Sequence, residues 1–175
     1  MAARPDLAIV RACTMRVLTE YGVSCGSVIE CSATEPTNWL YCRDSSNRCM
    51  VVGNPRFVKS LRKVTEGKMY KKYAGKAGTS YYLVAELLFH SGLRIRYIAY
   101  HINNNHAKAH QCFKPKAQQP AGVLREFLEA IIRCVNDDHI TILAGDGNKI
   151  GNYDYLLSYM RSLNCPFIST LSRNV

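Results

Sequence analysis

The feature that most constrains the fold is an ordered series of apolar segments whose periodicity changes from strand to helix and back. Residues 79–89 and 93–102 are rich in strand-forming side chains and flank a Ser-Gly turn signal, so we expect a hairpin. Residues 122–135 repeat apolar side chains at helical spacing. Residues 139–144 form another strand-like run. This succession predicts an α/β fold with β-sheet layers and flanking helices.

The other apolar segments are less regular. The run that ends at Tyr21 fits a strand followed by a helix, or one helix throughout. From 22 to 46, small and polar residues interrupt every possible element, so we expect loop or irregular edge structure. Residues 49–52 predict a short strand, and 152–163 predict a second amphipathic helix.

Positive charge is the second constraint. The chain has 23 Lys and Arg against 13 Asp and Glu, a formal net charge of +10, which points to a polyanionic partner. Residues 56–76 form a basic segment with the single acid Glu66. Its basic residues are Arg56, Lys59, Arg62, Lys63, Lys68, Lys71, Lys72 and Lys76. The segment is either a solvated surface loop or a nucleic-acid-binding surface.

The nucleic-acid interpretation assigns roles to particular side chains. Lys68, Lys71 and Lys72 would meet phosphates, and Tyr70 would stack on a base. Arg94 and Arg96 share one face of a predicted strand and would extend that surface.

Length, cysteine use and hydropathy place the protein in a broad class. Its 175 residues are ordinary for a single domain over 1–175. No stretch approaches the ~20 apolar residues of a membrane span, and no secretory signal is found. We therefore expect an intracellular protein, cytoplasmic or nuclear and not secreted. Its eight cysteines are expected to be mostly reduced.

Residues 103–120 are polar and are expected to form a surface loop. His106, His110 and Cys112 fall in this loop. They fit a zinc site in type, but no Cys pair completes it, so solvated side chains are the preferred interpretation.

The residues Gly145-Asp146-Gly147-Asn148 directly follow the strand-like run at 139–144. Groups at this position often bind ligands in α/β folds. Asp146 can bind Mg²⁺ or orient a general acid or base, and Asn148 can contact a phosphate oxygen. The alternative is an ordinary turn.

The segment from 79 to 168 resembles the endonuclease/exonuclease/phosphatase family, whose fold is exemplified by deoxyribonuclease I. The 145–148 motif is similar to the family's Gly-Asp-Phe-Asn, and the strand ending at His101 is similar to one that ends in a functional His or Tyr. Upstream, Pro5-Asp6-Leu7 resembles the family's Pro-Asp-Ile. The resemblance implies part of a two-sheet sandwich, with His101 as a general acid or base and Mg²⁺ or Mn²⁺ at Asp146.

The sequence also departs from the family pattern. Ala12 stands where the family has its metal-binding Glu, and the closing Asp-His pair has no counterpart before Val175. Glu66 or Glu86 is an alternative source of the missing carboxylate. The resemblance therefore implies either a divergent phosphodiesterase or nuclease, or a pseudoenzyme that binds nucleic acid or protein on the same scaffold.

Overall fold

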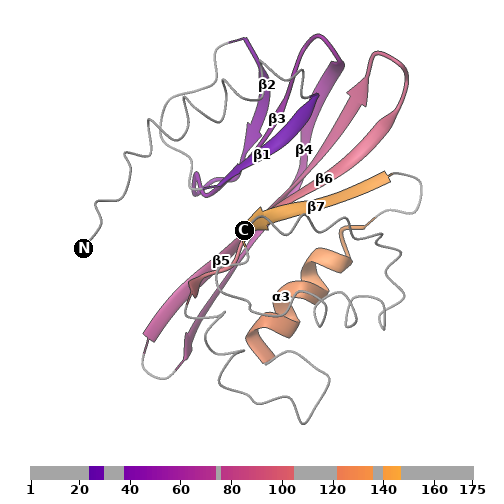
Figure 1. The fold of residues 1–175 in the computed structure, drawn as a ribbon. Coiled ribbons are helices and arrows are strands. Elements are labelled where there is room, and N and C mark those ends of the chain that lie inside the picture. Colours follow the sequence, from indigo (N-terminus) through magenta and orange to yellow (C-terminus); the bar gives the residue numbers. More distant parts are fainter. Residues whose placement is uncertain (1–23, 30–37, 74–75, 105–121, 136–139, 147–175) are drawn as a thin grey trace, which may run out of the picture.

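The computed structural model describes residues 24–29, 38–73, 76–104, 122–135 and 140–146. Seven strands and one helix lie in these ranges (Figure 1). They are β1 (Cys25–Ile29), β2 (Leu40–Arg43), β3 (Cys49–Gly53), β4 (Val58–Tyr73), β5 (Lys76–Phe89), β6 (Arg94–His101), α3 (Gly122–Ile132) and β7 (Ile140–Asp146).

The strands form two sheets. The smaller sheet has the order β1-β3-β2 and is antiparallel throughout. The larger has the order β4-β5-β6-β7, in which β7 is parallel to β6 and the other pairs are antiparallel. A parallel pair needs a crossover connection, and α3 lies in the connection from β6 to β7.

The larger sheet is the central layer, with the smaller sheet on one face and α3 on the other (Figure 1). Alternate side chains of β5 divide between the two faces, as a strand requires. Leu83 and Leu87 pack with Cys49 and Val51 of the smaller sheet, so this face is the inter-sheet face. Val84 packs on the helix-side face against buried α3 side chains, Phe127 and Ile131.

The predicted hairpin and the strand after the helix are confirmed. β5 and β6 pair antiparallel, and the turn uses Gly92, whose φ of +87° favours glycine. The helix ends at Ile132, with turn hydrogen bonds continuing to Val135. β7 is half-buried from 141 to 144 and exposed at both ends, because it is the outermost described strand of its sheet.

One expectation was wrong, and one of two alternatives is excluded. The stretch 22–46 contains β1 and β2, which flank the fully buried β3 and need no apolar run of their own because β3 supplies the central core. The basic segment 56–76 is not a surface loop. Most of it is β4, a 16-residue strand that pairs with β5 along its whole length.

Several predicted features lie outside the described residues. These are the elements before Tyr21, the helix at 152–163, most of the loop at 103–120, Asn148, and the His106, His110 and Cys112 group. None of the helices in the described ranges is long and apolar enough to cross a membrane.

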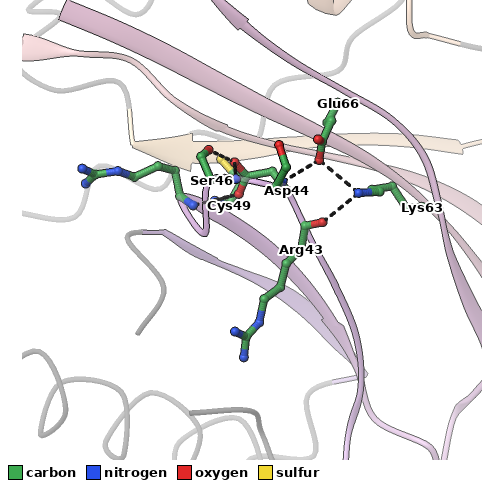
Figure 2. A network of polar contacts seen from close by, with 8 residues as sticks. Arg43, Asp44, Ser46, Cys49, Lys63 and Glu66 are labelled. Atoms are coloured by element: carbon green, nitrogen blue, oxygen red, sulfur yellow. Dashed lines mark hydrogen bonds and ion pairs between the residues drawn. The ribbon is translucent and has the colours of Figure 1, made fainter. Parts of the chain in front are cut away.

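A polar network joins the β2–β3 turn to β4 (Figure 2). Asp44 accepts hydrogen bonds from the backbone N–H groups of Ser46, Arg48 and Cys49, which holds the turn closed. Glu66 of β4 accepts one from the backbone N–H of Ser45, and Lys63 donates to Glu66 and to the Arg43 carbonyl. The network fixes the smaller sheet against the edge of the larger one.

The four cysteines in the described ranges are free thiols: Cys25, Cys42, Cys49 and Cys134. Burial raises the pKa of Cys42 to about 11, despite the nearby Lys63. This thiol is protonated at neutral pH and behaves as a small apolar side chain, as expected from the sequence.

Candidate active-site row at the end of the larger sheet

One cross-strand row brings together residues from all four strands of the larger sheet. Lys68 of β4 is in register with Tyr81 of β5, Tyr81 with His101 of β6, and His101 with Asp146 of β7. Residues in register point to the same face, here the inter-sheet face. Strands lie about 4.8 Å apart, so the row spans roughly 14 Å.

His101 and Asp146 are neighbours in this row. His101 is 7% exposed, whereas Asp146 is exposed to solvent. The backbone N–H of Ile102 donates to the carbonyl of Asp146, at 2.8 Å, and ties the end of β7 to β6. The pairing places a buried imidazole beside a solvent-accessible carboxylate.

Gly145 makes this close approach possible. A Cβ atom built on Gly145 would fall on the backbone carbonyl of Tyr100, so no side chain fits between the two strands. The glycine before Asp146 therefore has a packing role. It lets β7 come close enough for the Asp146 side chain to stand next to His101.

Tyr81 is a member of the row that sequence reasoning missed. Its ring stacks on His101, with centroids 6.5 Å apart and planes inclined by 26°. Its backbone carbonyl accepts a 3.9 Å contact from the Cys49 thiol of the smaller sheet. The signal was present in the predicted hairpin, because pairing strands across the Gly92 turn sets Tyr81 opposite His101.

Beyond the row, β4 and β5 continue as a projecting arm that consists of residues 68–73 and 76–80. β5 pairs with β6 only from Tyr81 onward, while its pairing with β4 continues to Tyr73↔Lys76, so this end is a two-stranded ribbon (Figure 1). Lys68 is exposed, and Tyr70 is 61% exposed on the same face. Lys71 and Lys72 continue β4 into the ribbon.

Arg94 and Arg96 do not join this surface. They lie on the helix-side face, in register with Leu88 and Glu86. Leu88 follows Tyr81 by seven residues along β5, so about 23 Å separate this end of the sheet from the row of Lys68. Arg96 pairs with Glu86 and donates to the Cys134 carbonyl just after α3, at 3.1 Å.

Neither candidate replacement carboxylate reaches Asp146. Glu66 lies on β4, three strand spacings or about 14 Å from β7. Glu86 lies on the opposite face, where Arg62 and Arg96 each contact one of its oxygens. Within the described ranges, no group of three or more His, Cys, Asp or Glu side chains is placed to hold a metal ion.

The Glu86 pair with Arg96 stabilises the fold in a pH-dependent way. Hydrogen bonds from Arg96 lower the pKa of Glu86, and Arg62 lowers it further, while burial opposes them. Because this pKa is lower in the folded state, the stabilisation is present at pH 7 and is lost as pH falls through the folded-state pKa.

We expect Glu86→Gln to lower the free energy of unfolding at pH 7 by roughly 1–3 kcal/mol, as charged hydrogen bonds in partly buried sites do. Urea unfolding at pH 7 and pH 3 measures it, and the wild-type advantage should shrink at pH 3. The exposed Glu126→Gln is the control and should change little. An equal Glu86→Gln effect at both pH values would contradict the assignment.

Comparison with known proteins finds similarity in structure but none in sequence families. No family model and no curated protein matches the sequence. Two sheets packed face to face, with a helix outside, are the arrangement of the deoxyribonuclease I-like fold, and the chain has part of that fold.

This conclusion rests on similarity to a solved structure, that of the human Nocturnin catalytic domain with bound sulfate anion, which has the deoxyribonuclease I-like fold. The two structures align over 90% of this chain, with a TM-score of 0.50 and 11% sequence identity. The chain spans 63% of the Nocturnin chain. The resemblance to the endonuclease/exonuclease/phosphatase family is thus confirmed at the level of the fold.

Proposed function

We propose that the protein binds nucleic acid along the row from Lys68 to Asp146 and acts on a phosphodiester at its His101 end. The observation that carries this proposal is the register of the larger sheet, which aligns Lys68, Tyr81, His101 and Asp146 on one face. A cation stands at one end of this row and an imidazole–carboxylate pair at the other.

The projecting arm supplies the chemistry of nucleic-acid contact. The sequence has no Asp or Glu between positions 67 and 85, so nearby acids in the sequence do not offset the charge of Lys68, Lys71, Lys72 and Lys76. Lysines that neutralise phosphates release counterions, which makes binding strong at low salt and weak at high salt. The exposed Tyr70 ring offers a stacking surface for a base.

His101 and Asp146 supply the chemistry of proton transfer. The imidazole takes a proton from the water that attacks phosphorus, and the adjacent Asp146 carboxylate stabilises the imidazolium that forms. The opposite P–O bond breaks, the leaving oxygen takes a proton from solvent, and the imidazolium then returns its proton to solvent. Stacking by Tyr81 holds the imidazole plane. Asn148, which is outside the described residues, is proposed as a phosphate contact.

The fold family implies Mg²⁺ or Mn²⁺, and these ions prefer several oxygen ligands. The described residues bring one carboxylate, Asp146, to this edge, and that donor set alone does not fit a divalent ion. The proposed steps therefore use the protein's own groups.

A non-enzymatic nucleic-acid-binding protein is the second candidate. The observation that favours it is that Asp146 is the one carboxylate that the described residues bring to this edge. Glu66 and Glu86 are both engaged elsewhere in the fold. In that case the arm binds as proposed, and Asp146 serves only to end β7.

Charge reversal on the arm tests the binding. We expect Lys68→Glu, Lys71→Glu and Lys72→Glu together to weaken binding to a fluorescent oligonucleotide by at least about tenfold at 50 mM salt. The slope of log affinity against log salt should also become shallower, because fewer counterions are released. Fluorescence anisotropy over a salt series measures both.

The matched control reverses Arg56, Lys59 and Arg94, which are exposed and carry the same total charge. They lie at the far end of the larger sheet, so this variant should keep most of the affinity. If both triple variants lose affinity equally, net charge rather than the arm governs binding. If neither does, the arm is only a solvated surface.

A further inference from the structure

A pocket of ≈ 240 Å³ opens at the far end of the larger sheet. Its lining residues are Ser60, Arg62, Glu86, Leu87, Leu88 and Arg94. In the register, Ser60, Leu88 and Arg94 form one row, and Arg62, Glu86 and Arg96 form the next. The pocket is remote from the row of His101, so the proposed function does not account for it.

The charges around this pocket do not cancel. Glu86 is the single acid in its lining, and its two oxygens are already taken by Arg62 and Arg96. Three guanidinium groups against one carboxylate leave two positive charges in excess. The side chain of Arg96 is only 14% exposed, which confines the available cations to Arg62 and Arg94.

Both of these arginines retain donors. Arg62 contacts Glu86 through Nη2 alone, and its side chain is 74% exposed. The guanidinium of the exposed Arg94 makes no hydrogen bond or ion pair with the described part of the chain. A guanidinium has five N–H donors in a planar fork that matches the oxygens of a phosphate.

We propose that this pocket binds the phosphoryl group of a small phosphate monoester, between Arg62 and Arg94. A monoester carries nearly two negative charges at pH 7, which matches the local excess of two positive charges. The Ser60 hydroxyl lies in the same lining and donates to a third oxygen, while the Leu88 side chain, in register with Ser60 and Arg94, supplies an apolar wall. The volume accommodates a phosphoryl group and a few further atoms.

Glu86 contributes by positioning rather than by contact with the ligand. Its carboxylate holds Arg62 and Arg96 together, and hydrogen bonds from Arg96 keep its pKa low. The Arg62 side chain is thereby fixed at the pocket edge, which lowers the entropy cost of closing on an anion.

Titration with inorganic phosphate at constant ionic strength tests the site, followed by the amide signals of the protein in NMR spectra. We expect saturable shifts at Ser60, Arg62 and Arg94 with a dissociation constant of about 1 mM, typical of one small anion. Arg94→Gln, which removes no contact within the described fold, should weaken binding at least about tenfold. Arg62→Gln should do the same.

The control is Lys68→Gln, which should leave the phosphate-induced shifts at Ser60, Arg62 and Arg94 unchanged because Lys68 lies at the other end of the sheet. Glycerol 2-phosphate should bind at least as tightly as inorganic phosphate, and failure to bind would overturn the assignment to a monoester. Shifts that do not saturate, or that persist in Arg94→Gln, would mean an adventitious ion only. These outcomes are independent of nucleic-acid binding, which uses the arm.

Discussion

Asp146→Asn should reduce nucleic-acid cleavage by at least about a hundredfold while leaving the melting temperature nearly unchanged. The substitution is nearly isosteric, and the residue is exposed, so little packing is lost. What is lost is the negative charge beside His101, which stabilises the protonated imidazole. Nicking of supercoiled plasmid and cutting of a short RNA, each with and without Mg²⁺ or Mn²⁺, measure the effect.

His101→Gln is the companion variant and should lose cleavage to a similar extent, because the two groups act as one unit. Both variants should still bind oligonucleotide, since the arm is unchanged. Equal cleavage by wild type and Asp146→Asn would indicate a contaminating nuclease. Binding by the wild-type protein without cleavage of any substrate would support the non-enzymatic candidate.

Gly145→Ala should lower the free energy of unfolding by about 2–3 kcal/mol and the melting temperature by roughly 5–10 °C. The added methyl group meets the backbone carbonyl of Tyr100, which cannot move aside without breaking the β6–β7 pairing. Calorimetry measures the stability. The same displacement moves Asp146 away from His101, so cleavage should fall together with stability.

Gly92→Asn is the matched control for this prediction. Gly92 has a φ of +87°, which Asn tolerates better than most residues, and a Cβ there meets nothing within 4 Å. This variant should melt within about 2 °C of wild type. A Gly145→Ala protein that is equally stable would show that the end of β7 lies farther from β6 than described.

The sequence was most informative where local pattern and tertiary structure agree. The hairpin of β5 and β6 has strand-forming runs and a glycine turn, and it formed as predicted. The Gly145-Asp146 motif comes directly after a strand-like run, and it forms the last two residues of β7, so the placement of Asp146 at a strand end was also predictable. Such features depend on residues close together in the chain.

The other features of the fold and of the candidate site depend on residues that are far apart in the sequence. β1 and β2 have no strong strand pattern, and they form because the apolar β3 offers an edge on each side. The separation of Arg94 and Arg96 from Lys68 follows from register along β5 and β6, which no local pattern of charges reveals. Lys68 lies in the row of His101 for the same reason, through the register of β4 with β5.

The long strand β4 also has a consequence for how copies of the protein behave together. It is the outermost strand on its side of the described sheet, and the backbone groups of such an outer strand can recruit another strand. Exposed Lys59, Arg62, Lys63 and Lys68 line it, and like charges would face each other if two copies paired through this edge. These four cations, among them the Lys68 proposed to contact nucleic acid, thereby oppose self-association, and this protection weakens as salt screens the repulsion.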